Sequence, residues 1–163
     1  MTGLRDSEFE RLYAEHAQGL FGFLTYRTGD RVLAEDLVAD TFERVLLSRS
    51  RFDPRRGRQK AWVYAIAMNL LRDAARRRQT EERALEKVAV GGDDDRPPHE
   101  ALDERDAIQR AMERLAPEER DVIALRFGAD LPLKDIALAI GASDTTTQGR
   151  LYRALRKLKE ELG

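Results

Sequence analysis

Apolar residues recur every three or four positions along most of this chain, which is the spacing that gathers them on one face of an α-helix. The pattern predicts helices over about residues 7–27, 31–48 and 60–78, a periodic stretch at 108–115, a helix that starts at Pro117, and a helical pair within 131–158. Proline is well suited to the first turn of a helix. The expected fold class is therefore all-α.

The first two predicted helices have clear apolar stripes and are separated by the helix-breaking triplet Thr28-Gly29-Asp30. The first stripe comprises Phe9, Leu12, Tyr13, Leu20, Phe21 and Leu24, and the second comprises Ala34, Leu37, Val38, Phe42, Val45 and Leu46. We expect both stripes to be buried against neighbouring helices.

Another face of the helix predicted at 31–48 is acidic, because Asp36, Asp40 and Glu43 follow one another at intervals of four and three residues. Like charges at this spacing repel by about 0.2–0.5 kcal/mol per pair. This acidic ridge, defined as Asp36, Asp40 and Glu43, therefore weakens its own helix. The residues alone leave two interpretations open, a docking surface for a basic partner or an ordinary solvated face.

Residues 52–60 read FDPRRGRQK, which combines proline and glycine with four basic side chains and predicts a mobile cationic loop. The helix that follows opens near Trp62 and ends in Arg76, Arg77 and Arg78. Positive charge beside aromatic rings suits single-stranded nucleic acid, because bases stack on rings and the backbone follows the charge. The alternatives are that Trp62 packs in the core and that the arginines complement the helix dipole.

The stretch 131–158 has the outline of a helix-turn-helix. In its first helix the buried stripe is Ile136, Ala137 and Ile140, and the positions expected to face water are Lys134 and Asp135. Gly141 is the predicted left-handed cap of this helix. Ser143 or Asp144 is the predicted N-cap of the second helix.

The second helix of the pair has five cations and no acid between Thr146 and Lys159. A helix in the major groove needs short polar groups near its start for base edges and long cations beyond them for phosphates. The first role suits Thr145, Thr146, Gln148 and Arg150, the second suits Arg153, Arg156 and Lys157, and the apolar positions are Leu151, Tyr152, Ala154, Leu155 and Leu158. The alternative is a solvated basic face on an ordinary helical hairpin.

The overall net charge of −1 conceals a strong segregation of charge along the chain. The net charge is −4 over residues 1–48, +8 over 49–78, −7 over 79–121 and +2 over 122–163. Two cationic blocks separated by an acidic one indicate two separate contacts with a polyanion.

The composition disfavours several kinds of function. The absence of cysteine excludes disulfides, thiol catalysis and cysteine-ligated zinc, and His16 and His99 have no metal-ligand spacing. We therefore expect no metal and no cofactor, and few candidates for catalytic residues remain. No apolar run approaches the roughly 20 residues of a membrane span, and the first residues are too polar for a signal peptide. The expected location is the cytoplasm, without membrane insertion.

Three blocks of the sequence, in this order, resemble the extracytoplasmic-function (ECF) branch of the bacterial sigma-70 family. They are AEDLVADTFERVL at 34–46, WVYAIAMNLLRDAARRR at 62–78, and the stretch 113–162 that contains the helix-turn-helix. The resemblance covers nearly the whole chain. It implies two small helical domains, a region 2 bundle at 1–85 and a region 4 helix-turn-helix at 105–163, joined by a flexible acidic linker at 86–104.

The resemblance also implies roles for individual residues. Binding to core RNA polymerase would fall to Asp36, Asp40 and Glu43. Binding to minus-10 promoter DNA would fall to Arg55, Arg56, Arg58, Lys60, Trp62, Asn69, Arg76 and Arg77, and binding to minus-35 DNA to Thr146, Gln148, Arg150, Arg153 and Arg156. The implied partners are core RNA polymerase, promoter DNA and an anti-sigma factor. The polymerase performs the chemistry, so the chain itself would not be an enzyme.

The chain departs from the family pattern at two places. Gln59 stands three positions before Trp62, where the family often has an aromatic residue. Thr147, Gln148 and Gly149 occupy the usual small-apolar and lysine-serine positions of the recognition helix. Glycine inside a helix costs about 1 kcal/mol relative to alanine, so we expect this helix to be weaker alone.

Two other functions fit parts of the sequence. A stand-alone helix-turn-helix regulator would bind duplex DNA without polymerase, but it gives no reason for the acidic ridge. A helical adaptor that binds only proteins would show no salt-dependent binding to DNA.

Overall fold

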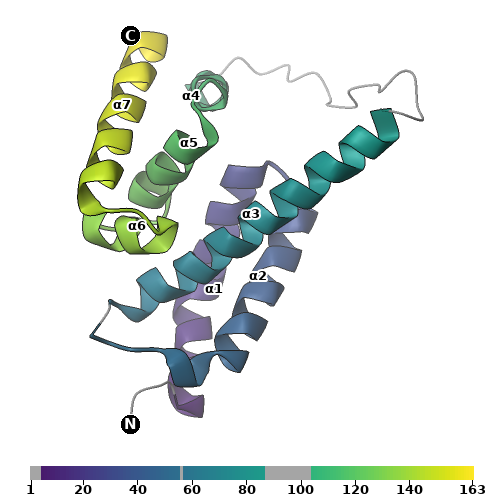
Figure 1. The fold of residues 1–163 in the computed structure, drawn as a ribbon, viewed down its shortest axis with the longest axis vertical. Helices are drawn as coiled ribbons and strands as arrows, with labels where there is room; N and C mark the ends of the chain where they lie inside the picture. Colours follow the sequence, from purple (N-terminus) through teal and green to yellow (C-terminus); the bar gives the residue numbers. More distant parts are fainter. Residues whose placement is uncertain (1–4, 56, 87–103) are drawn as a thin grey trace.

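The computed structural model describes residues 5–55, 57–86 and 104–163, which form helices joined by short turns, with no β-strand in these ranges (Figure 1). In chain order the elements are α1 (Asp6–Thr28), α2 (Arg31–Leu47), the 3₁₀ turn η1 (Arg49–Arg51), α3 (Gln59–Glu86), α4 (Glu104–Glu113), α5 (Pro117–Ile123), the π-helical turn η2 (Ala124–Gly128), α6 (Leu133–Ile140) and α7 (Asp144–Leu162). The all-α prediction is confirmed. Arg56, His99 and most of the expected linker lie outside the described residues.

A tight turn joins α1 to α2. Gly29 ends α1 in the left-handed conformation, with φ of 70°, and its N–H donates to the Thr25 carbonyl. The Asp30 carboxylate then caps α2 by accepting a hydrogen bond of 3.1 Å from the Leu33 N–H. The predicted break at 28–30 is confirmed, and α1 and α2 pack against each other (Figure 1).

The core of the first three helices follows the predicted stripes with two exceptions. Tyr13 and Leu46 were expected to be buried but are 51% and 41% exposed, whereas Thr41 is fully buried. A buried hydroxyl needs a hydrogen-bond partner. Thr41 has one, because its Oγ1 donates to the Leu37 carbonyl one turn earlier at 2.6 Å. The inner face of α2 is therefore rotated slightly away from Leu46.

Helix α3 is longer at both ends than the sequence pattern indicates. It begins at Gln59, so Gln59 and Lys60 are helical and not part of the preceding loop. It continues to Glu86, eight residues beyond Arg78, where the apolar periodicity fades. Residues 79–86 contain no proline or glycine and are rich in good helix formers, so local propensity continues the helix without burial.

The last four helices form a small bundle with Met112, Leu115, Ile123 and Ala154 at its centre. Burial was expected for the apolar positions Tyr152 and Leu155 on α7 and for Phe127 in the apolar stretch after Pro117, but these side chains are 66%, 41% and 63% exposed, respectively. The wider turn of η2 buries Leu125 but leaves Phe127 outside. On α7 the inner face follows Thr147, Leu151, Ala154 and Leu158, which excludes the other two positions.

The two groups of helices share apolar packing. In Figure 1, α3 crosses α1 and α2, and α6 lies beside α3 while α7 lies farther out. One continuous cluster of buried residues includes Phe23, Tyr64 and Met68 from the first group and Leu131 and Ile136 from the second. The domain division at 86–104 stays a prediction. Elements from before and after it nevertheless pack together, namely α3 with α6 and α1 with η2.

Candidate polymerase and promoter interface

The acidic ridge lies on the solvent side of α2. Asp36, Asp40 and Glu43 are exposed, while Leu37 and Val45 on the opposite side of the helix are buried. None of the three carboxylates forms an ion pair with a described residue. An unpaired row of carboxylates costs electrostatic repulsion and contributes no burial, so the fold itself does not account for it.

An aromatic pair lies where the predicted cationic loop meets α3. Phe52 is buried, Trp62 is partly buried, and their ring centroids are 5.2 Å apart. Both rings line a pocket of about 200 Å³ together with Gly57 and Leu138, among others. The partial burial of Trp62 agrees with packing in the core, and its ring also borders a pocket, so its role toward nucleic acid stays a prediction.

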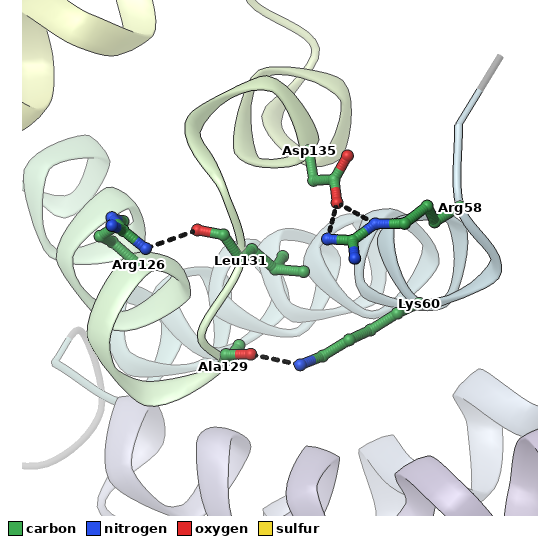
Figure 2. A network of polar contacts seen from close by, with 6 residues as sticks. All are labelled: Arg58, Lys60, Arg126, Ala129, Leu131 and Asp135. Carbon is green, nitrogen blue, oxygen red and sulfur yellow. Dashed lines mark hydrogen bonds and ion pairs between the residues drawn. The ribbon is translucent and has the colours of Figure 1, made fainter.

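The cations around this pocket differ in their partners. Arg55 is exposed and its Nε lies 3.2 Å from Asp53 in the same loop. The Arg58 guanidinium donates two hydrogen bonds to Asp135 on α6, that from Nε at 2.8 Å, and Lys60 Nζ donates to the Ala129 carbonyl at 2.5 Å (Figure 2). The prediction that Asp135 faces water is wrong, since it is only 6% exposed. A charge-assisted pair with Arg58 makes its burial tolerable.

The middle of α3 presents the other predicted minus-10 contacts. Asn69, Arg76 and Arg77 are exposed, and Arg76 forms a local hydrogen bond of 2.6 Å with Asp73. Beside them lies a cleft of about 620 Å³ between α1, α3 and α5. Its lining includes five arginines, namely Arg27, Arg72, Arg76, Arg78 and Arg120. Burial lowers the pKa of Arg120, as expected for a cation away from water.

The recognition helix α7 is well capped at its start. Gly141 ends α6 with φ of 69°, and Ser143, not Asp144, is the N-cap, because its Oγ accepts the Thr146 N–H at 3.1 Å. Thr146 and Gln148 in the first turns are exposed, Arg150 is partly exposed, and Arg153 and Arg156 are exposed. Their side chains therefore remain available on one helix.

Two α7 residues have structural roles that the sequence did not suggest. Thr147 is fully buried, and its hydroxyl donates to the Ser143 carbonyl at 2.8 Å, so this polar group is satisfied within the seam. Lys157, predicted to hold phosphate, lies with its Nζ 2.7 Å from Glu119 on α5. Burial alone would raise the pKa of Glu119, but hydrogen bonds from Lys157 and the Ala116 N–H lower it overall.

The sequence reasoning missed the internal partners Asp135, Leu138 and Ala129. One signal was available for Asp135, which lies four residues before the buried Ala139 and so shares its helix face. No local signal identifies the Ala129 carbonyl, because a backbone acceptor is independent of side-chain identity.

Comparison with known proteins agrees with this arrangement. Residues 12–81 match the family described as Sigma-70 region 2, and residues 105–158 match Sigma-70, region 4. The first match contains the acidic ridge, the loop and most of α3, and the second contains the helix-turn-helix. The two sets of candidate binding residues therefore fall in two separate family matches.

Full-length relatives show the same order. RNA polymerase sigma factor CarQ of Myxococcus xanthus is 33% identical, over 99% of this chain and 92% of the relative. ECF RNA polymerase sigma factor SigX of Bacillus subtilis is 30% identical, over 96% of this chain and 88% of the relative. The sigma factor RpoE of Bartonella quintana, solved in complex with the anti-sigma factor NepR, matches with a TM-score of 0.77 at 23% identity, covering 96% of this chain and 97% of that one.

These similarities define the class of protein, a sigma-70-type factor with regions 2 and 4. The chain belongs to the ECF branch of that family. Its function is to bind core RNA polymerase and direct promoter recognition and transcription initiation. No helix in the described part of the chain is long and apolar enough to cross a membrane.

Proposed function

We propose that this sigma factor divides its work among three surfaces. The acidic ridge on α2 docks on the clamp of core RNA polymerase, the loop at 52–60 and α3 hold the displaced minus-10 strand, and α7 reads the minus-35 element. The observation that supports this most strongly is the solvent-facing, unpaired acidic ridge on a chain whose α7 also presents exposed cations. A stand-alone DNA-binding protein has no use for such a ridge.

The chemistry of each surface suits its assigned ligand. Unpaired carboxylates attract a basic partner surface and speed its association. Trp62 and Phe52 offer aromatic rings for stacking, and the adjacent cations attract the phosphate backbone. Arg150 and Gln148, near the start of α7, are within the part of a recognition helix that reaches base edges, and Arg153 and Arg156 follow for phosphates.

The same proposal covers partners and location. The sigma factor RpoE of Bartonella quintana was solved with the anti-sigma factor NepR, and we propose that an anti-sigma factor also controls this chain. Core polymerase and promoter DNA place its action in the cytoplasm. The bond-forming chemistry belongs to the polymerase, so this protein is not an enzyme.

The test is run-off transcription with purified core polymerase on a genomic promoter library, combined with co-elution. The double variant Asp36→Lys/Asp40→Lys should lose co-elution and transcript, because it replaces attraction by repulsion at the docking surface. The matched control is Glu10→Lys/Glu160→Lys, which makes the same charge change at two exposed acids elsewhere and should retain both. Equal behaviour of the two variants, or wild-type protein that stimulates no transcript, would reject the proposal.

A further inference from the structure

Helix α6 is in direct contact with the loop that the proposed function assigns to the minus-10 strand. Asp135 and Leu138 lie three residues apart on α6 and both reach toward the start of α3. The Asp135 carboxylate accepts both hydrogen bonds of the Arg58 guanidinium (Figure 2). The Arg58 side chain is still 62% exposed, so this pair is accessible to a competing anion.

A second cation of the proposed strand site, Lys60, also has a hydrogen-bond partner in region 4. Lys60 Nζ donates to the Ala129 carbonyl, which lies directly after η2. This segment is held in place nearby, because the Arg126 guanidinium donates to the Leu131 carbonyl at 3.4 Å (Figure 2). Arg58 and Lys60, two of the proposed phosphate contacts, therefore have internal partners in this structure.

Leu138 restricts the aromatic pocket. It lines the same pocket of about 200 Å³ as Phe52 and Trp62. A Cβ atom built on Gly57 would lie only 2.8 Å from Leu138 Cδ1, so the loop and α6 are in close contact. A base entering to stack on Trp62 would meet this side chain, and α6 would need to move away.

The contact is part of a larger interface between regions 2 and 4. Arg27 on α1 pairs with Asp121 on α5 at 2.7 Å, and both side chains are largely buried. Arg72 on α3 donates to the Ile140 carbonyl at the end of α6 at 3.4 Å. These two polar contacts and the shared apolar cluster show that α5 and α6 pack closely against region 2.

We infer that this arrangement is a closed state in which region 4 occupies the strand-binding site of region 2, with Arg58–Asp135 as its polar clasp. The guanidinium cannot satisfy Asp135 and a DNA phosphate with the same donors, so strand binding and closure compete. Only open molecules can bind single-stranded DNA, so the apparent dissociation constant equals the intrinsic one divided by the open fraction. The inference rests on the proposed strand site and adds a control on it.

A reversible cross-link tests the closed state directly. The chain has no cysteine, so the full-length Gly57→Cys/Leu138→Cys variant has only the two introduced thiols. Oxidation of the free protein should join them, because a Cβ atom built on Gly57 lies 2.8 Å from Leu138 Cδ1, which brings side chains at the two positions within reach of each other. Failure to cross-link in folded protein, judged by intact mass and circular dichroism, would overturn the closed state. Each single-cysteine variant under the same oxidant is the control for oxidant damage.

The binding readout is the fluorescence of Trp62, the single tryptophan of the chain, which borders the site itself. Titration with single-stranded DNA of random sequence should quench the reduced double-cysteine variant. The cross-linked form should need at least about tenfold more DNA, and reduction should restore quenching, since closure multiplies the apparent dissociation constant. Equal titration curves for the two forms would overturn the inference.

The clasp itself is tested by Asp135→Asn, which keeps the size of the side chain and removes its charge. Its Trp62 titration should shift to about threefold lower DNA concentration, the size expected for loss of one partly exposed ion pair. Glu160→Gln, which removes the same charge from an exposed site on α7, should shift it less. Equal shifts in the two variants would show a general charge effect and reject the clasp.

Failure of this inference and failure of the proposed function are distinguishable. Wild-type run-off transcription tests the function and does not depend on Asp135 or the cross-link. Cross-linking reports the closed contact even where no transcript is made. Normal transcription with no cross-link would leave the function standing and reject the closed state.

Discussion

The cationic surface at the start of α3 and the one on α7 carry similar side chains, but only the first is bound to other parts of the protein. At the start of α3, Arg58 and Lys60 are bound to Asp135 and to the Ala129 carbonyl of the other region. On α7, Arg153 and Arg156 are exposed and form no ion pair with a described residue. Charge along a sequence therefore locates a candidate surface for nucleic acid, but it does not tell whether that surface is available.

The difference has a consequence for regulation. Under the closed state inferred above, the exposed helix α7 makes first contact with duplex DNA, and the covered loop acts only after region 4 has moved. Such an order of events would suit a factor that must hold a promoter before it captures a melted strand. Lys157, also on α7, differs from both groups because its ammonium donates a hydrogen bond to the buried Glu119 carboxylate.

The largest effect is expected from substitutions of the exposed cations on α7. Arg150→Ala/Arg153→Ala should lower run-off transcription from a cognate promoter by at least about tenfold, since each lost DNA contact costs roughly 1–3 kcal/mol. Loss of the one phosphate contact assigned to Arg153 should also reduce the slope of log affinity against log salt by about 0.9. The control Arg114→Ala removes a region 4 cation whose partner, Glu161, lies at the surface. Retained activity in the double variant would contradict the assignment of α7 to DNA.

A smaller effect, on stability, is expected when the ion pair between Lys157 and Glu119 is broken. Glu119→Gln should destabilise the protein by about 1–2 kcal/mol, because a buried group loses a charge-assisted hydrogen bond from Lys157. Urea unfolding followed by circular dichroism measures this change.

The pH dependence of that variant gives a second check. The pKa of Glu119 is lower in the folded protein, so its contribution is present above the unfolded pKa of about 4.3 and is lost as pH falls through the folded value. Glu119→Gln should therefore differ most from wild type above about pH 5 and least in strong acid. A difference that grew with acidity would contradict the assigned ion pair.

The smallest effects concern two glycines, Gly141 in the turn before α7 and Gly149 within α7, and their signs should be opposite. Gly141→Ala should cost about 1 kcal/mol, because φ of 69° strains any residue with a Cβ. Gly149→Ala should stabilise α7 by up to about 1 kcal/mol, since its added Cβ meets only the flexible end of Arg153 at 3.4 Å. Thermal unfolding of both variants checks the signs, and the same sign for both would refute the account of the turn.

Local signals predicted the elements well where capping and periodicity agreed. Gly29, Gly141 and Pro117 each ended or started a helix as expected, because backbone conformation at these positions depends mainly on the residue itself. Prediction failed for Phe127, where the wider turn of η2 shifts the register of the apolar face. Period counting assumes a regular helix and cannot anticipate such a turn.

The sequence predicted the exposure of the candidate site residues only in part, and their roles stay proposals. The acidic ridge and the α7 arginines are exposed as expected, since they lie opposite the apolar stripes of their own helices. The partners of Arg58, Lys60 and Lys157 lie 77, 69 and 38 residues away in the chain, respectively. Contacts across such separations depend on how helices pack, which no local pattern encodes.

The sequence by itself determined the helical class, most of the helix ends, the order of the two family regions and the residues proposed to meet polymerase and DNA. These follow from turn chemistry, periodicity and charge, which act over a few neighbouring residues. Only the tertiary structure decided which cations are free, because the packing of α6 on α3 brings Asp135 and Ala129 to Arg58 and Lys60. Pairing between distant residues is a property of the packed chain.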